Sequence, residues 1–337
     1  MRSNLRSERE IMNSWRGDKP IVSILCVTYN HGEYLEDALE GFLIQKTEFP
    51  YEVLIHDDAS TDNTADIIRE YVKAYPNIIR PIYQTENQYS KGIIIDDVFL
   101  IPKSQGTYIA LCEGDDYWTD PLKLQKQYEA MEKHPEVDLC SHASIDIDAR
   151  TKHQVGFEKH SEIDCIIPVE EVIKGDGGFL ATASLFGRRE VFDCSKWSNF
   201  RKKMKYDYTI QIDGALRGGV YYFKDFMSVY RKMASSSWTK RMALDPLYRN
   251  NYFEKKIGML RQLDIDTNGK YTKVIKIKIM ESLITSYKYK ELFSPEFRPY
   301  FKYFPFFKLV KYFIRAKIPY LAELKRRKDV REVLKVR

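Results

Sequence analysis

The 337-residue sequence predicts an α/β fold, with a mostly parallel sheet covered by helices on both faces. Two patterns lead to this prediction. Short apolar runs rich in β-branched residues alternate with segments whose apolar residues recur at helical spacing, which indicates right-handed βαβ units. Polar clusters follow several of the apolar runs. Because ligands bind beyond the C-terminal ends of the strands in such sheets, these clusters mark the expected site.

The first expected strand is PIVSILCV at residues 20–27, whose lack of polar alternation suits a strand buried on both faces. Helices are expected at 32–46 and after the turn DDASTDNT, where Ser60 or Asp62 would cap the first turn. Another helix is expected to begin at Asp120, since the following proline presets the backbone for a helical turn. The further strand signals lie at residues 51–56, 77–83, 107–112, 137–141, 179–186 and 220–223.

Three regions differ in composition along the chain. Residues 1–18 are polar and charged, which predicts an arm or a loose helix, and they lack the apolar core of a secretory signal. Residues 19–240 carry the alternation of strands and helices and are expected to form the main domain. Residues 241–337 are expected to form a helical extension, whose most unusual stretch is the aromatic and basic run FRPYFKYFPFFKLVKYFIRAKIPYL.

The net charge of +6 is unevenly distributed along the sequence. Residues 271–337 hold 18 Lys and Arg against 6 Asp and Glu, a balance of +12, so the other 270 residues sum to −6. A strongly basic segment predicts an anionic partner, which could be a membrane surface, a nucleic acid or an acidic polymer.

Composition argues against several classes of protein. The apolar fraction of 44% is sufficient for a sizeable core and excludes wholesale disorder. No apolar run approaches 18 residues, so a transmembrane helix is not expected. The five cysteines are odd in number and widely spaced, which predicts reduced cytoplasmic thiols rather than disulfides or a zinc site. They are Cys26, Cys112, Cys140, Cys165 and Cys194.

The motif EGDDYW at residues 113–118 crowds Glu113, Asp115 and Asp116 at the end of an expected strand. Like charges in such a place repel each other, and a hard divalent cation would remove the penalty. Mg²⁺ and Mn²⁺ prefer oxygen ligands, commonly one or two carboxylates together with phosphate oxygens. The alternative is a solvated turn that precedes the helix start at Asp120.

Two further clusters follow the first two expected strands. In IHDDASTDNT, capping by Ser60 or Asp62 would leave Asp57 and Asp58 free to accept hydrogen bonds from a base or a ribose. In VTYNHGEYL, Tyr29 could stack on a base, although a tyrosine buried in the core is the simpler reading of this residue alone.

Taken together, these motifs resemble those of the family 2 glycosyltransferases of the GT-A fold. The similarity rests on PIVSILCVTYNHGEYLEDALEGFLIQ, YEVLIHDDASTDNTADII and GTYIALCEGDDYWTDPLKLQKQ, in this order, and it is strongest over residues 20–134. A weaker similarity continues to residue 238, so that about two thirds of the chain is covered. The resemblance is to the bacterial branch that builds capsule, O-antigen and exopolysaccharide repeat units, with a nucleotide-binding half at 19–142 and an acceptor half at 143–240.

The resemblance implies roles for the clusters above. The wall that holds the nucleotide base would comprise Val27, Tyr29 and Asp58, with Asp57 beside it. Asp116 would bind Mn²⁺ or Mg²⁺ on the donor diphosphate, and Asp115 would contact the ribose or also bind the metal. Glu113 stands where many relatives have Asp. The loop with Asn87, Lys91 and Gly92 would lie near the donor, where Lys91 either screens the diphosphate or is an ordinary solvated lysine.

The resemblance also implies a catalytic base at the start of a later helix, before the sequence VYR. Asp207 matches this position, where a helix dipole stabilises an ionised carboxylate, and Asp213 is the alternative. Many relatives carry a metal-proximal histidine shortly after VYR, whereas this chain has Met233, a poor ligand for a hard cation. Ser237 and Trp238 resemble an acceptor-side motif, but a tryptophan that only packs is an equal alternative.

The function implied is inverting transfer of a sugar, with a UDP-sugar as the expected donor, to a hydroxyl of a saccharide acceptor. A lipid-linked acceptor and peripheral attachment at the inner face of the plasma membrane would suit the basic and aromatic extension. The extension could instead pack on the core or on a second subunit. The alternatives are a non-catalytic binding or scaffold protein and a sugar nucleotidyltransferase. The sequence lacks the G-x-G-x-x-G motif that a dinucleotide-dependent oxidoreductase would need after the first strand. It also lacks a recognisable module for specific nucleic-acid binding.

Overall fold

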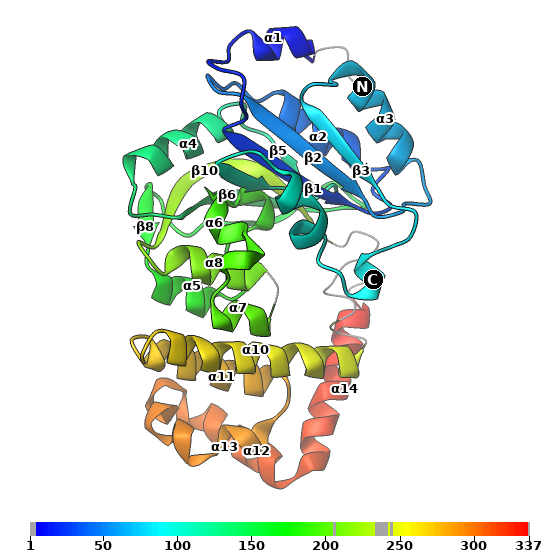
Figure 1. Cartoon of the computed structure of the whole chain (residues 1–337). Coiled ribbons are helices and arrows are strands. Elements are labelled where there is room, and N and C mark those ends of the chain that lie inside the picture. Colours follow the sequence, from blue (N-terminus) through cyan, green and yellow to red (C-terminus); the bar gives the residue numbers. More distant parts are fainter. Residues whose placement is uncertain (1–4, 205–206, 233–241, 243–244, 336–337) are drawn as a thin grey trace. The chain divides into compact units, whose positions relative to one another are not determined.

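The computed structural model describes residues 5–204, 207–232, 242 and 245–335. The chain forms two compact units. Unit 1 comprises residues 1–197 and 206–234, and unit 2 comprises residues 198–205 and 235–337. Unit 1 contains the sheet and unit 2 contains helices (Figure 1). The predicted α/β fold with a helical C-terminal region is confirmed.

Unit 1 is built on a ten-stranded mixed sheet with the order β3-β2-β1-β4-β9-β6-β10-β5, in which β7 pairs with β6 and β8 with β10. The neighbours β3, β2, β1 and β4 run parallel, as do β6 and β10, whereas β5, β7, β8 and β9 pair antiparallel. The strands are β1 (Val22–Thr28), β2 (Tyr51–Asp57), β3 (Ile79–Tyr83), β4 (Tyr108–Leu111), β5 (Tyr117–Trp118), β6 (Leu139–Asp148), β7 (Gln154–Glu158), β8 (Cys165–Ile167), β9 (Phe186–Arg188) and β10 (Val220–Lys232).

Helices surround this sheet in unit 1 (Figure 1). Helix α2 packs on β5, α3 on β2 and β3, α4 on β6 and β10, and α8 on β6 and β10. The apolar face predicted for residues 32–46 is the buried face of α2, with Leu35, Leu39 and Phe42 inaccessible to solvent. The α-helices are α1 (Glu8–Met12), α2 (Leu35–Leu43), α3 (Thr64–Ala74), α4 (Lys123–Lys133), α5 (Val169–Gly175), α6 (Arg189–Phe192) and α8 (Asp207–Ala215). Short 3₁₀ or π turns occur at η1 (Tyr89–Lys91), η2 (Asp96–Leu100), η3 (Ile101–Lys103), η4 (Thr182–Ser184) and η5 (Cys194–Lys196).

Three local predictions were wrong in their details. The segment predicted as a strand at 179–186 contains the turn η4 at Thr182–Ser184, and β9 begins only at Phe186. Helix α4 begins at Lys123 rather than at Asp120, whose carboxylate instead accepts a hydrogen bond from the backbone N–H of Leu122, 2.8 Å away. The strand predicted at 220–223 extends to Lys232, because β10 continues along β6 past a bulge.

The N-terminal segment is folded rather than loose. Ser7 and Glu10 form a capping box at the start of α1, which satisfies N–H groups that the first helical turn leaves without partners. Ile11 is fully buried, and the ring of Trp15 packs edge-on against Tyr51 with centroids 5.4 Å apart. Residues 5–18 therefore contribute to the core of unit 1.

Unit 2 is helical, with a core formed by α10 and α11. Buried apolar residues of this core are Met259, Leu260, Leu263, Ile275 and Ile279. Its elements are α7 (Asn199–Lys203), α10 (Pro246–Asp266), α11 (Thr272–Thr285), α12 (Tyr289–Leu292), η6 (Pro295–Tyr303), α13 (Phe306–Lys317) and α14 (Pro319–Lys335). Within the described part of the chain, none of the helices combines the length and the hydrophobicity that crossing a membrane requires.

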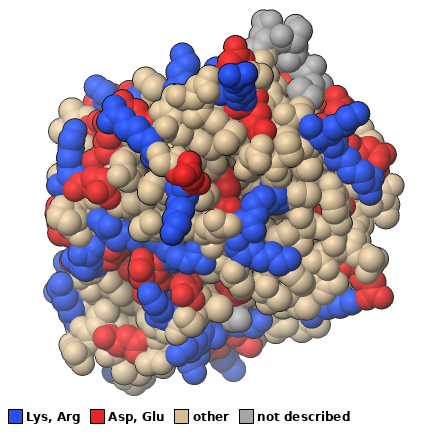
Figure 2. All heavy atoms as spheres, turned by 45° about the horizontal axis from the view of Figure 1, so that its top comes forward, with Lys and Arg blue, Asp and Glu red and all other residues tan. Residues whose placement is uncertain are grey.

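Positive and negative side chains lie next to one another over the face of the molecule shown in Figure 2. The basic excess of the sequence is concentrated in the C-terminal elements. From residue 301 to residue 317, which includes all of α13, there are five Lys or Arg and no Asp or Glu.

Candidate active site

The ends of β1 and β2 lie side by side because the two strands pair in register from Val22 with Tyr51 to Thr28 with Asp57. The loops that follow are joined by direct hydrogen bonds. The backbone N–H of Asn30 donates to Ser60 Oγ (2.9 Å), and Asn30 Oδ1 accepts from the backbone N–H of Thr61 (2.7 Å). Parallel pairing therefore brings the first two predicted clusters to one edge of the sheet.

Asp58 does not have the free carboxylate that the sequence suggested. It is 1% exposed, and its two oxygens accept hydrogen bonds from the backbone N–H groups of Gln88 (2.8 Å) and Tyr89 (3.0 Å). Asp58 therefore fixes the loop after β3 at this edge of the sheet. A nucleotide that bonds this carboxylate would therefore use oxygens that already accept these two backbone hydrogen bonds.

Asp57 and Asp62 also bond within this edge. Asp57 is 3% exposed, and its Oδ1 accepts from the backbone N–H of Ser60 (3.2 Å). Of the two predicted caps, Asp62 is the one that bonds the first turn of α3, by accepting from the backbone N–H of Thr64 (3.0 Å). Ser60 instead holds the loop after β1 through Asn30.

Tyr29 and Val27 are at the end of β1. The ring of Tyr29 is 38% exposed rather than buried in the core, so it is accessible to a ligand. The carbonyl of Val27 accepts from the backbone N–H of Gly114 (2.9 Å), which joins β1 to the motif EGDDYW. A Cβ on Gly114 would lie 2.9 Å from Cβ of Thr28, so only glycine allows this close approach.

Five carboxylates influence one another at this edge of unit 1: Asp96, Glu113, Asp115, Asp116 and Asp207. Burial and the neighbouring charge of Asp115 raise the pKa of Asp116 well above its ordinary value. The side chain of Glu113 is exposed to solvent, yet protein atoms crowd around it, and this desolvation together with the charges of Asp115, Asp207, Asp116 and Asp96 raises its pKa strongly. Burial and the charges of Asp207 and Asp97 raise the pKa of Asp96 to about 7.

Asp207 joins this cluster although it is about ninety residues away in sequence. It is the first residue of α8, and its Oδ2 accepts a hydrogen bond from Thr182 Oγ1 (2.7 Å). Burial raises its pKa, while the bond from Thr182 opposes this increase. Asp207 is a source of the pKa shifts of Glu113 and Asp96. The alternative base, Asp213, is six residues further along the same helix.

Lys91 is in the loop that Asp58 holds. Its ammonium group forms an ion pair with Glu86, and this pair lowers the pKa of Glu86. The side chain is exposed. Met233, Ser237 and Trp238 lie outside the described residues.

The sequence reasoning did not assign a role to Arg231, the arginine of VYR. This residue is 8% exposed; its backbone N–H donates to Asp116 Oδ1 (2.8 Å) and its Nη1 donates to the carbonyl of Asp115 (2.7 Å). Its Nη2 also forms an ion pair with Asp37, and the guanidinium lies over the ring of Tyr117, 4.4 Å from the centroid. Arg231 therefore holds Asp115 and Asp116 in position. Its place in the motif VYR was the signal in the sequence that could have identified it.

His31 was also missed. Its Nε2 lies 3.9 Å from Asp115 Oδ2, and its buried Nδ1 has no hydrogen-bond partner among the described residues. Its place in VTYNHG, directly before Gly32, was the signal in the sequence. A Cβ on Gly32 would lie 1.9 Å from Asn63 Oδ1, so a larger residue there would require the side chain of Asn63 to move.

A row of polar side chains lies on one face of β7, β6 and β10. The register pairs Ser144 with Glu158 and with Ser228, and it places Tyr230 beside Asp146. Asp146 pairs with Lys232 (2.7 Å) through one oxygen. Four buried atoms of this row have no hydrogen-bond partner among the described residues: Ser144 Oγ, Asp146 Oδ1, Glu158 Oε2 and Ser228 Oγ.

This polar row adjoins the carboxylate cluster. The pKa of Tyr230 is raised by burial and by the charges of Asp116, Glu113, Asp115 and Glu158, so that its side chain links the two groups. Each unpartnered buried polar atom costs about 1–3 kcal/mol. A ligand or water molecules that supply hydrogen bonds would remove this cost.

The residues fit a divalent cation only in part. Among the described residues, no three His, Cys, Asp or Glu side chains converge in the arrangement of a complete protein-built metal site. The buried carboxylate of Asp116, crowded by Asp115, suits the one or two protein oxygens that Mg²⁺ or Mn²⁺ takes when phosphate oxygens supply further ligands.

Comparisons with known proteins show the family of this chain. The model of the family "Glycosyl transferase family 2" matches residues 23–235. An uncharacterized protein of Mycobacterium tuberculosis, Rv1520, is 37% identical over 222 residues, which cover 64% of this chain and 60% of that protein. TuaG of Bacillus subtilis, named as a glycosyltransferase of teichuronic acid biosynthesis, is 36% identical over 36% of this chain and 44% of its own.

Solved structures share the fold. TarS of S. aureus, in complex with UDP, superposes with a TM-score of 0.57 at 15% identity, over 92% of this chain and 88% of that one. The chain spans only about 60% of the length of the mycobacterial relative. The family model, however, spans well over half of the sequence. The chain therefore belongs to glycosyl transferase family 2.

Proposed function

We propose that the protein is an inverting glycosyltransferase that moves a sugar from a nucleotide-diphosphate sugar to a hydroxyl group of a saccharide acceptor. The observation that carries this proposal is the electrostatic interaction of Asp207 with Glu113 and Asp96, near the edge of the sheet where β1 and β2 end. Transfer of the sugar in a single displacement requires a general base close to the site that binds the nucleotide-sugar.

The donor nucleotide would lie against the exposed ring of Tyr29 and the edge formed by Val27, Asp57 and Asp58. UDP is the favoured nucleotide, because a carboxylate oxygen can accept the imino proton of uracil. TarS has been solved in complex with UDP and with UDP-GlcNAc, which supports a UDP-sugar here. Asp115 would accept from a ribose hydroxyl.

Asp116 would hold Mn²⁺ or Mg²⁺ together with phosphate oxygens, and the cation would supply neutralisation of the charge that develops on the leaving diphosphate. Arg231 keeps Asp116 in place by its backbone N–H. Lys91 could add positive charge from the loop after β3 if its ion pair with Glu86 opens.

Asp207 would act as the general base that takes the proton of the acceptor hydroxyl as this oxygen attacks the anomeric carbon. Its elevated pKa brings it closer to neutral pH, where a base is most effective, and Thr182 holds one of its oxygens. Attack from the face opposite the leaving group inverts the anomeric carbon without a covalent intermediate.

The polar row beside Tyr230 supports a saccharide as the ligand on the acceptor side. Serine hydroxyls and carboxylates with unused hydrogen-bonding capacity match sugar hydroxyls, and an aromatic ring next to them can stack on a sugar face. The acceptor is proposed to be a lipid-linked unit of a bacterial surface polysaccharide, in keeping with the named role of TuaG.

Attachment to the inner face of the plasma membrane is part of this proposal. In α13, Phe306 and Phe307 are 72% and 85% exposed, and cations are interspersed with the apolar side chains. Such a helix can lie at an anionic bilayer surface. Flotation with anionic vesicles should fall for the double variant Phe306→Ser/Phe307→Ser and stay unchanged for Phe157→Ser, an exposed phenylalanine of unit 1.

Calorimetry with UDP, GDP, dTDP and CMP, with and without Mn²⁺, tests the main proposal. We expect one diphosphate to bind in a metal-dependent manner, and Asp116→Asn to abolish this binding while Asp120→Asn leaves it intact. If folded wild-type protein binds none of these nucleotides, the transferase proposal fails and a scaffold role is favoured.

A further inference from the structure

The C-terminal helical unit contains an apolar pocket that no part of the transfer chemistry uses. Its volume is about 480 Å³, within the range of about 300–1,000 Å³ that is usual for small-molecule sites. Seven of its eight lining residues are apolar: Phe293, Phe301, Phe304, Phe306, Leu309, Val310 and Phe313, with Lys302 as the eighth. They come from η6, from α13 and from the end of α12.

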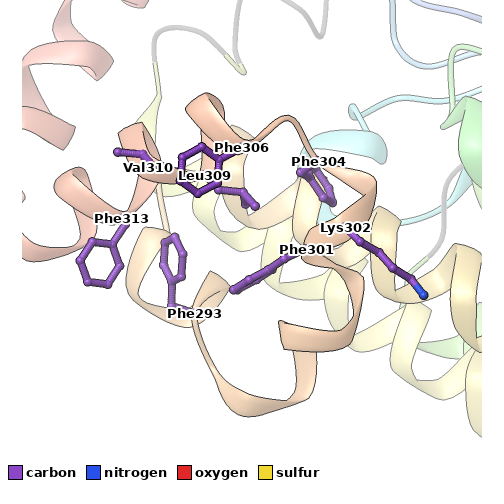
Figure 3. A pocket seen from close by; sticks show the side chains of 8 residues that line it. All are labelled: Phe293, Phe301, Lys302, Phe304, Phe306, Leu309, Val310 and Phe313. Atoms are coloured by element: carbon purple, nitrogen blue, oxygen red, sulfur yellow. The ribbon is translucent and has the colours of Figure 1, made fainter.

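The pocket is shaped by aromatic packing. The ring of Phe293 meets the rings of Phe301 and Phe313 edge-on, with centroids 5.4 Å and 5.3 Å apart. Figure 3 shows these rings around one space, with Phe304 and Phe306 at its other side. Lys302 extends away from the rings, and its ammonium group is at the far end (Figure 3). The pocket thus combines an apolar interior with a cation at its margin.

Its surroundings favour an anionic partner. The five cations from residue 301 to residue 317 are Lys302, Lys308, Lys311, Arg315 and Lys317, with no acidic residue among them. A second copy of the chain docking by the same surface would oppose two such segments, and like charges disfavour that pairing. None of the residues of α13 is buried, and the lining residues Phe306 and Phe313 are 72% and 47% exposed.

We propose that this pocket binds one hydrocarbon chain of a phosphate-headed lipid. The hydrocarbon chain would fill the space between Phe293, Phe304 and Phe313, and the phosphate would lie near Lys302. A second cation, Lys317, lies 5.6 Å from the ring centroid of Phe313. Removing the hydrocarbon chain and the lining rings from water provides the free energy, and the cations select the headgroup. The inference depends on unit 2 alone, so its failure would leave the proposed nucleotide and acceptor chemistry untouched.

Calorimetric titration of the full-length protein with dodecyl phosphate, kept below its micellar concentration, tests this inference. We expect saturable binding of one molecule per chain. Dodecyl maltoside, with the same chain and a neutral head, should bind more weakly, and inorganic phosphate should not bind measurably. Lys302→Gln should reduce the preference for the phosphate head over the maltoside head.

Two variants separate the pocket from general surface adsorption. Leu309→Trp places a larger side chain in the pocket and should weaken binding about tenfold or more. Tyr320→Ala removes a ring of α14 that is 68% exposed and does not line the pocket, and it should change the affinity by no more than about twofold.

Far-ultraviolet circular dichroism would establish that both variants are folded, and Val310→Trp provides a second filling variant if Leu309→Trp is not. Equal loss in the filling variants and in Tyr320→Ala would overturn the pocket assignment, as would the absence of saturable binding to the wild-type protein. Preserved UDP binding in the same samples would show that only the lipid inference had failed.

Discussion

Asp116 accepts a hydrogen bond from the backbone N–H of Arg231, 2.8 Å away, across 115 residues of sequence. The same arginine uses its guanidinium group to bond the carbonyl of Asp115, so that β10 holds the aspartate pair at two points. Both contacts exist because β5 pairs antiparallel with β10, with Tyr117 opposite Val229. The geometry of the candidate metal motif is therefore set by a strand of the acceptor half.

Replacing Arg231 by Lys should separate these two contacts. The backbone N–H bond to Asp116 would remain, whereas the fork of guanidinium bonds to Asp115 and Asp37 would be lost. We expect the free energy of unfolding, measured in urea, to fall by about 1–3 kcal/mol, and metal-dependent nucleotide binding to weaken. Lys224→Arg, at an exposed site on the same strand, is the control. Unchanged stability and binding in Arg231→Lys would show that the guanidinium group is dispensable.

Asp207→Asn should lower kcat by about 10²–10⁴, the usual contribution of a general base, and leave nucleotide affinity nearly unchanged. The amide is close in size to the carboxylate and can keep its carbonyl oxygen toward Thr182. Asp213→Asn is the matched control, six residues further along the same helix. If Asp213→Asn is the variant that loses turnover while Asp207→Asn is active, the base is Asp213.

Stability should decrease as the pH rises from about 4.5 to 7, through the contribution of Glu158. Burial and the charge of Asp146 raise the pKa of Glu158 from its ordinary value to about 7, while Lys232 opposes this increase. The folded state therefore keeps a proton that the unfolded chain has lost, and deprotonation favours unfolding. The slope for one proton is at most about 1.4 kcal/mol per pH unit.

The comparison of wild type with Glu158→Gln isolates this contribution, because other carboxylates of the site titrate in both proteins. Unfolding curves in urea at several pH values should show a shallower decrease for Glu158→Gln over this window. Glu162→Gln, whose side chain is exposed, should follow the wild type. Parallel curves for all three proteins would contradict the placement of Glu158 in a desolvated acidic pair.

Strands and helices whose hydrophobic pattern is local could be predicted from the sequence, and so could motifs recognised by their order along the chain. The run VSILCVT is fully apolar or small and became β1, and the amphipathic run of α2 buried the face expected of it. Parallel topology then brought the residues after β1 and β2 together. These inferences needed only periodicity and the rule that strand ends bind ligands.

The remaining features depend on long-range contacts that no local pattern encodes. The extension of β10 to Lys232 follows from its pairing with β6, and the turn η4 forms where Ser184 meets Ser141 across the sheet (2.6 Å). Asp58 looked free because Gln88, its partner, is thirty residues away in sequence. The residues of the polar row are separated along the chain in the same way.

The two backbone bonds that Asp58 accepts predict a role in shaping the donor site. In Asp58→Asn, one carboxylate oxygen becomes an NH₂ group, which cannot accept from the N–H of Gln88 or Tyr89. One of these two part-buried backbone donors then lacks its partner, at a cost of at most about 1–3 kcal/mol, and the loop after β3 should loosen. We expect faster amide hydrogen exchange in residues 86–92 and weaker binding of UDP, whereas the exchange rates in α10 should stay unchanged.

Asp66→Asn, on the exposed face of α3, is the control, since its carboxylate bonds only Arg69 among the described residues. Weaker UDP binding with unchanged exchange in the loop would mean instead that Asp58 acts on the nucleotide directly, as its place beside Tyr29 first suggested.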